Sequence, residues 1–396
     1  MHNSETQDEL QNQPCAYASD KIDCRRSSAN RGCTMSSYAK IVELPFDLDP
    51  VYRSYLTPSY YLGILGCYCD LRPLLASYFI GLALPTDRQI EKGVGALIPD
   101  LPELSDLSEL GYLGMSTYEE TGESFCPCAA IEWIIEKLNC GEYIYVTVNE
   151  YFLPDTFSFN RKNFAHPCLI LGCDVPQRRF TICNYSKMGD YRLLNILFSD
   201  LAKCLAIRGP ATEQQFNGHY QRRILALNPS PQVRARFDFS NTRKRLRGYL
   251  SGQLQYERPS SGRIPWITDP EGYTFGIRAF ASYSNYIKWA VDRGIKVDMR
   301  NTRVLFEQKK IMSNNISYFG ELFRWTDTDS FLKLHQPVIE WAHKLHLLAF
   351  AYNLDYKTGC RLSDFASNID HIVEIDRKLL TILCDLLDVE STRFSV

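Results

Sequence analysis

The chain has 396 residues, of which 45% are hydrophobic and 13% aromatic, and its formal net charge at neutral pH is −2. This length predicts two or three domains with substantial cores. The nearly balanced charge gives no general attraction for nucleic acid or for an anionic membrane, and no apolar window is long enough to cross a bilayer. We therefore expect a globular, cytoplasmic protein that binds neither nucleic acid nor membranes.

The N-terminal residues 1–39 are polar and lack the apolar core of a secretory signal, so we expect a disordered extension there. The 14 cysteines are scattered, many of them in apolar segments where thiols behave as small hydrophobic groups. Without an export signal we expect them to be reduced. The Cys-x-Cys pairs Cys67/Cys69 and Cys126/Cys128 lack the spacing of zinc sites. We expect no metal and no bound cofactor.

Residues 40–209 combine helical and strand patterns. Apolar residues at helical spacing run from Cys67 to Phe79. Pro73 favours a start nearer Cys69, because proline is tolerated only in the first turn of a helix. The other expected elements are a helix over 127–138, strands over 143–148, 168–173 and 180–183, and a helix over 192–206. This mixture predicts an α/β (α+β) domain.

A Gly-Pro pair at 209–210 marks the expected end of this domain. Residues 210–275 are rich in proline and predict an irregular linker or accessory segment, with a basic run from Arg234 to Arg247. Apolar residues recur at helical spacing over 276–396, which predicts an all-helical bundle domain. The expected breaks between its four helices fall near Asn301, Asp327 and Gly359.

Two short apolar strands carry the most informative polar residues. His166 stands at the head of the first strand, and Asn184 ends the second. A histidine at a strand end can act as a general base, and an amide on the neighbouring strand can fix its tautomer. Upstream, Cys67 or Cys69 at a helix N-terminus would have a stabilised thiolate, because the positive end of the helix dipole lies there. Cysteine and histidine of such sites meet only in the folded chain.

These segments resemble the N-terminal domain of the butirosin-biosynthesis acyltransferase family over about residues 60–190. The resemblance rests on Cys67 with its helix and on the segments Val148–Pro154, His166–Asp174 and Ile182–Asn184. The chain departs from the family pattern at two positions. Asn184 stands where the family usually has aspartate, and Glu150 matches an acidic position of the family only loosely.

The resemblance implies a papain-like catalytic domain over 40–209, with Cys67 or alternatively Cys69 as nucleophile, His166 as base and Asn184 as orienting residue. Such proteins move an acyl group from the phosphopantetheine thioester of a carrier protein, through a cysteine acyl-enzyme, to an amine. They belong to nonribosomal peptide and aminoglycoside pathways. The expected function is therefore that of an acyltransferase, or amide synthase, in natural product biosynthesis.

The partners implied are an acyl or peptidyl carrier protein and an amine acceptor. The basic run at 234–247 could dock an acidic carrier by electrostatic attraction; it lacks the interleaved aromatic residues typical of nucleic-acid binding. Two alternatives stay open, a papain-like cysteine peptidase and a catalytically inactive scaffold that binds carrier proteins. The oligomeric state does not follow from the sequence.

Overall fold

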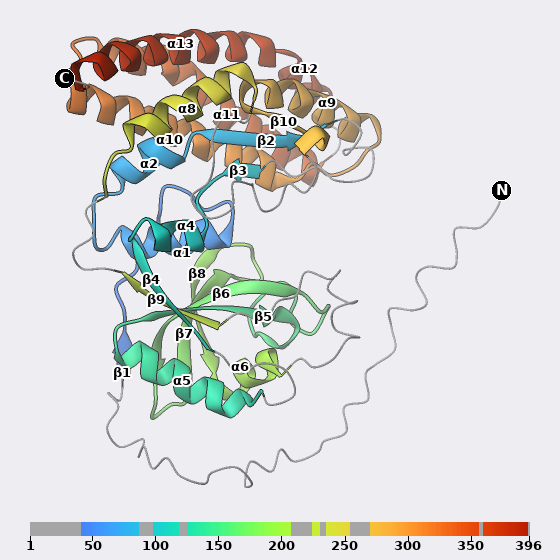
Figure 1. Ribbon diagram of the computed structural model, residues 1–396. Helices are drawn as coiled ribbons and strands as arrows, with labels where there is room; N and C mark the ends of the chain where they lie inside the picture. Colours follow the sequence, from blue (N-terminus) through green and yellow to red (C-terminus); the bar gives the residue numbers. More distant parts are fainter. Residues whose placement is uncertain are drawn as a thin grey trace, which may run out of the picture. The chain divides into compact units, whose positions relative to one another are not determined.

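The structure is a computed structural model, and it describes residues 41–86, 98–118, 125–206, 224–229, 235–253, 270–355 and 359–394. The contacts of these residues group them into one unit, Ala39–Val396. An antiparallel sheet with helices on its two faces makes up the N-terminal part, and helices dominate the C-terminal part (Figure 1). The expected disordered extension and the expected boundary at 209–210 lie outside the described residues.

The larger sheet has seven antiparallel strands in the order β4-β9-β5-β6-β7-β8, with β1 pairing with the far end of β6. The strands are β1 (Ile41–Glu43), β4 (Leu113–Thr117), β5 (Tyr143–Asn149), β6 (Ala165–Asp174), β7 (Arg179–Tyr185), β8 (Tyr191–Leu197) and β9 (Ile224–Pro229). The register sets His166 opposite Val148 and Leu169 opposite Cys183. The start of β6 and the end of β7 therefore lie side by side at the same end of the strands.

Helices cover both faces of this sheet. On one face lies α1 (Leu56–Leu65), from which the Tyr60 hydroxyl donates to the carbonyl oxygens of Pro167 and Cys183. On the other lie α5 (Pro127–Asn139) and α6 (Phe198–Leu205), which pack against each other and against β5. Because successive strand residues point to opposite faces, Tyr145 faces α1, while Val146 and Val148 face α5 and α6.

Most of the expected elements of this part are confirmed, namely the helix of α5 and the strands β5, β6 and β7. The expected helix over 192–206 is wrong in its first half. Residues Tyr191–Leu197 form β8, which pairs with β7, and the helix begins only at Phe198. Pairing with an existing strand outweighed local helical spacing there.

The expectation of an irregular segment over 210–275 is wrong at strand β9, which joins the larger sheet, and at residues Phe239–Ser251, which form helix α8. The Asp238 carboxylate accepts a hydrogen bond from the backbone N–H of Asn241, which caps the helix. Gly252, in the left-handed conformation, ends it. The basic run from residue 239 onward is therefore helical, and Arg234 lies outside the described residues.

The remaining elements include a second antiparallel sheet of β2, β3 and β10, in the order β10-β2-β3. Its strands are β2 (Gly81–Pro85), β3 (Ile98–Asp100) and β10 (Tyr273–Phe275), and the short helices are α2 (Arg72–Tyr78), α4 (Leu104–Glu109), η3 (Glu150–Phe152), η4 (Pro270–Gly272) and η5 (Gly276–Arg278).

The C-terminal region is helical, as expected, but its described part has five helices instead of four. They are α9 (Ala279–Asp292), α10 (Met299–Phe323), α11 (Thr328–Leu354), α12 (Gly359–Ser367) and α13 (Ile369–Phe394). The expected break near Asn301 falls slightly earlier, at residues 293–298 between α9 and α10, because Asp298 caps α10 and the helix begins at Met299. The breaks near Asp327 and Gly359 are confirmed.

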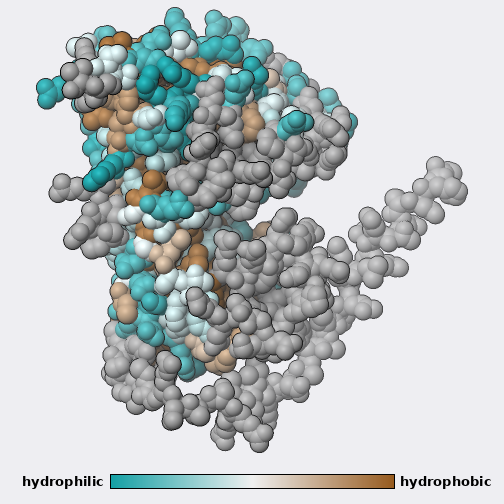
Figure 2. Space-filling model, in the orientation of Figure 1, coloured by the Kyte–Doolittle hydropathy of each residue, from teal (hydrophilic) through white to brown (hydrophobic). Residues whose placement is uncertain are grey.

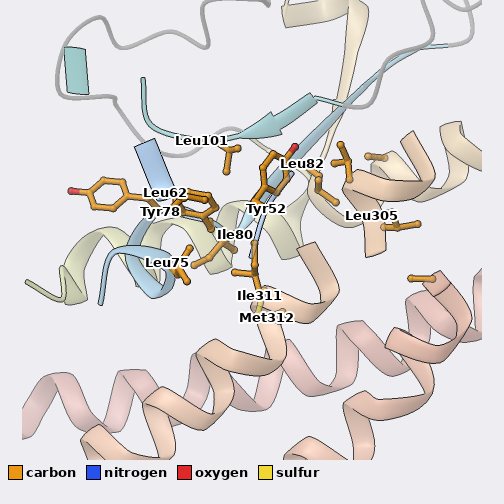
Figure 3. Close-up of a cluster of buried hydrophobic side chains, with 14 of the residues drawn as sticks. Tyr52, Leu62, Leu75, Tyr78, Ile80, Leu82, Leu101, Leu305, Ile311 and Met312 are labelled. Carbon is orange, nitrogen blue, oxygen red and sulfur yellow. The ribbon is translucent and has the colours of Figure 1, made fainter. Parts of the chain in front are cut away.

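One apolar core joins the two parts. Figure 3 shows Leu62 of α1, Leu75 of α2 and Leu82 of β2 in the same cluster as Ile311 and Met312 of α10. Burial of apolar surface is the main stabilising contribution in folding, so the helical region and the N-terminal part stabilise each other. None of the helices within the described ranges is long and apolar enough to span a membrane.

Candidate active site

His166 and Glu150 form a close pair where β5 ends and β6 begins in the larger sheet. The distance between His166 Nδ1 and Glu150 Oε1 is 2.7 Å. Glu150 directly follows β5, and its backbone N–H donates to the Phe164 carbonyl just before β6. The pairing of β5 with β6 therefore brings these two side chains together, although they are far from adjacent in the sequence. Glu150 is 6% exposed and His166 28% exposed.

Asn184 is fully buried beside this pair. Its Nδ2 donates to Glu150 Oε1 over 3.4 Å, and its Oδ1 accepts from the backbone N–H of Tyr185 over 2.7 Å. Both ends of the amide thus have a partner, which holds the side chain in one orientation. Glu150 is therefore the residue that contacts the histidine ring, whereas Asn184 contacts Glu150. The expectation that Asn184 orients His166 directly is replaced by this indirect role.

The pair defines which ring nitrogen of His166 can act on a substrate. An ionised carboxylate can only accept hydrogen bonds, so Nδ1 carries the hydrogen when Glu150 is ionised. In the neutral imidazole Nε2 then has a free lone pair. A half-buried ring held in this tautomer is suited to accept a proton at Nε2, and the buried carboxylate stabilises the imidazolium that results.

From the sequence alone, Glu150 was only a loose match to an acidic position, and its contact with His166 was not predicted. The available signal was a carboxylate at the end of a predicted strand, next to the strand that begins with His166. Two paired strands present side chains from neighbouring ends to one another. This signal becomes specific only once the register of the two strands is known.

Cys67 lies elsewhere, and the prediction that it begins a helix is wrong. It comes directly after Gly66, which caps the C-terminal end of α1, and its backbone N–H donates to Ile64 O while its Sγ lies 3.5 Å from Gly63 O. The helix end carries the negative end of the dipole, which disfavours a thiolate. Burial and the nearby Asp47 carboxylate raise the pKa of the Cys67 thiol. Burial and the Asp70 carboxylate raise the pKa of Cys69.

The structure does not bring Cys67 and His166 together. Tyr68, the neighbour of Cys67, lies with its hydroxyl 3.2 Å from that of Tyr143, at the start of β5. His166 lies opposite Val148 of β5. Val148 is five residues beyond Tyr143 on that strand, so the two are about 16 Å apart at the usual rise per residue. Tyr143 and Val148 also point to opposite faces of the sheet. Cys69 belongs to the same turn as Cys67 and shares this position.

Cys168 is the cysteine closest in sequence to His166, two residues further along β6 and on the same face. It is fully buried, and burial together with the nearby Cys204 raises the pKa of its thiol well above the usual value. A buried, protonated thiol is a packing group and not an activated nucleophile.

The basic run of α8 is largely engaged within the chain. Arg243 and Arg247 pair with Asp388 of α13, and Arg245 is 2% exposed and donates to the Tyr78 carbonyl. These contacts attach α8 to the helical region, so this run is poorly suited to dock a carrier protein. The view in Figure 2 shows mainly hydrophilic residues over α8 and α13.

Comparison of the chain with models of known protein families gave no match, and comparison with curated proteins gave none either. The resemblance to the acyltransferase family therefore stays a prediction. The functional conclusion rests on the geometry of His166, Glu150 and Asn184.

Proposed function

We propose that the protein is an acyltransferase in which His166 acts as general base while an acyl group passes from a thioester to an amine. The observation that carries this proposal is the contact between His166 Nδ1 and Glu150 Oε1, 2.7 Å, with the ring partly exposed. We propose further that the larger sheet with α1, α5 and α6 is a papain-like core. A histidine at the head of one strand and an amide at the end of the next support this assignment.

The proposed reaction proceeds without an acyl-enzyme on Cys67 or Cys69, because both lie far from His166. The amine nitrogen attacks the thioester carbonyl while His166 Nε2 accepts its proton. The new C–N bond forms, the C–S bond of the tetrahedral intermediate breaks, and the leaving thiolate takes the proton from Nε2. Glu150 stabilises the transient imidazolium through Nδ1, and Asn184 holds Glu150 in place. The donor is the phosphopantetheine thioester of a carrier protein.

A second candidate is the catalytically inactive scaffold. The position of Cys67 and Cys69 away from His166 favours it, because a papain-like peptidase or acyl-enzyme mechanism needs a thiol beside the base. The two candidates differ in one observable property. An enzyme releases thiol from a thioester in the presence of an amine, and a scaffold binds the carrier without releasing it.

The test follows thiol release and amide formation from acyl-pantetheine and acyl-carrier thioesters with an added amine. We expect His166→Ala to lower turnover by about a hundredfold or more, and Glu150→Gln by about tenfold or more. His343→Ala is the matched control, since this exposed histidine stacks on Phe306 of α10.

The cysteine variants decide the route of the acyl group. The double variant Cys67→Ala/Cys69→Ala should keep its turnover, and the intact mass of the protein should show no acyl adduct. An adduct on either cysteine would overturn direct transfer and restore the acyl-enzyme. Thiol release without amide would assign a hydrolase, and no release from either donor would assign the scaffold.

A further inference from the structure

The loop between β5 and β6, which ends next to His166, exposes three phenylalanines. They are Phe157, 58% exposed, Phe159, 36%, and Phe164, 39%. Exposed apolar side chains that form a contiguous patch mark an interaction site. The Phe164 ring centroid lies 5.0 Å from that of His166, so the apolar surface reaches the proposed general base.

Internal contacts hold this loop in shape. The backbone N–H of Phe164 donates to Asn149 Oδ1, and Asn149 Nδ2 donates to Asn163 Oδ1, which ties the two ends of the loop. Thr156 and Ser158 are buried, and the Thr156 hydroxyl donates to the Leu153 carbonyl. Because buried residues alternate with the exposed phenylalanines, the loop presents these rings to solvent as a consequence of its fold.

Two cations lie over these rings. The Arg161 guanidinium is 5.2 Å from the centre of the Phe157 ring, and the Lys162 ammonium is 5.0 Å from the centre of the Phe164 ring. Neither cation forms an ion pair with another residue in the part of the chain that the structure describes. Lys187 and Asp155 nearby lie 3.8 Å apart and offset each other's charge. The loop therefore has two positive charges available to an anionic ligand.

We propose that Phe157, Phe159, Phe164, Arg161 and Lys162 form an aromatic–cationic rim that binds the donor of the acyl group. The inference rests on the proposed function and specifies its substrate. The phosphate of a carrier-bound phosphopantetheine arm pairs with Arg161 and Lys162, and the apolar part of the donor lies on the phenylalanine rings. This arrangement directs the thioester toward His166 Nε2.

The chemistry of the rim matches this donor better than a neutral one. Charge-assisted hydrogen bonds from arginine or lysine to phosphate are roughly twice as strong as neutral ones. Aromatic faces accommodate apolar chains through area burial and need no directional partner. A thioester that lacks the phosphate would gain only the apolar burial on the rings, so the phosphate should determine the affinity.

The experiment compares one acyl thioester on phosphopantetheine with the same thioester on pantetheine, which lacks the phosphate. For Arg161→Ala/Lys162→Ala we expect KM for the phosphorylated donor to rise about tenfold or more, with KM for the other donor unchanged. Arg293→Ala is the matched control, because Arg293 lies 5.0 Å over the Trp289 ring in the helical region. Equal changes for both donors, or none for either, would overturn the assignment of the phosphate site.

Binding of a thioether analogue of each donor, measured by calorimetry on the full chain, separates this inference from the proposed function. Phosphate-dependent binding that Arg161→Ala/Lys162→Ala removes, without turnover of any thioester, would support the rim and reject the acyltransferase. Turnover with equal affinity for both analogues would support the acyltransferase and reject the rim. A carrier-bound donor that binds no more tightly than the free phosphopantetheine donor would limit the rim to the arm itself.

Discussion

Removing one charge from a buried ion pair in the helical region should strongly lower the free energy of unfolding. Lys309 of α10 and Asp376 of α13 are 0% and 1% exposed, and Lys309 Nζ lies 2.6 Å from Asp376 Oδ2. Tyr249 of α8 accepts from Lys309 and donates to the same carboxylate oxygen. His335 of α11 lies 3.7 Å from the other carboxylate oxygen. The cluster thus connects four helices.

Removing one partner leaves the other as an unpaired charge that water cannot reach. Asp376→Asn and Lys309→Met should each lower the free energy of unfolding by about 3–5 kcal/mol. This loss is a large part of the total stability of about 5–15 kcal/mol that folded proteins have. The double variant Lys309→Met/Asp376→Asn carries the same two substitutions and removes both charges together. It should recover most of the loss, because no charge then remains buried.

The assay is urea unfolding of the full chain, followed by circular dichroism, with a double-mutant cycle for the pair. Asp70→Asn is the control, because its partner Arg72 is 48% exposed and exposed pairs contribute about 1 kcal/mol or less. Single variants that lower the free energy of unfolding by no more than this control would contradict a costly buried charge. A double variant that lost the sum of the two single losses would contradict it as well.

Three further predictions concern pH, backbone conformation and thiol reactivity. Burial alone would raise the pKa of Asp376, but Lys309 and His335 lower it to about 2. The folded pKa of Asp376 is then below its unfolded value of about 3.9. Its stabilising contribution is therefore present above about pH 3.9 and is lost as the pH falls toward about 2. The urea midpoint should fall less steeply with acid in Asp376→Asn than in the unmodified protein. Gly276→Ala should destabilise the protein by more than about 1 kcal/mol, because Gly276 has φ +55° and a Cβ there would lie 2.1 Å from the Tyr249 carbonyl oxygen; an unchanged thermal midpoint would contradict this. The raised pKa values of Cys67 and Cys69 should make both thiols react with iodoacetamide at neutral pH more slowly than a free peptide thiol, as followed by peptide mass spectrometry; faster reaction would show an activated thiolate.

Several elements could be predicted from the sequence because their patterns are local. The amphipathic spacing of α5 and the β-branched and aromatic run of β5 are sufficient signals. The apolar segments of β6 and β7 likewise placed His166 at a strand head and Asn184 at a strand end. The two residues lie near each other because the strands that carry them are neighbours both in the sequence and in the sheet.

The helix α1 could not be predicted in this way. Eight of its ten residues are buried, so the helix has no polar face and no apolar periodicity. The helical spacing that begins at Cys67 belongs to α2 in its later part, where Leu74, Leu75 and Tyr78 are buried. The same spacing continues by chance into the preceding turn, which is why it suggested a helix start at a cysteine that in fact follows a helix end.

The sequence by itself thus determined the type and order of the strands that carry His166 and Asn184, because side-chain periodicity along a strand is a local property. Only the tertiary structure decided which residues meet. The register of β5 against β6 pairs Glu150 with His166, and the packing of α1 on the opposite face keeps Cys67 away from both. Register and packing depend on contacts between distant segments, and their free energies are not encoded in any short stretch of the chain.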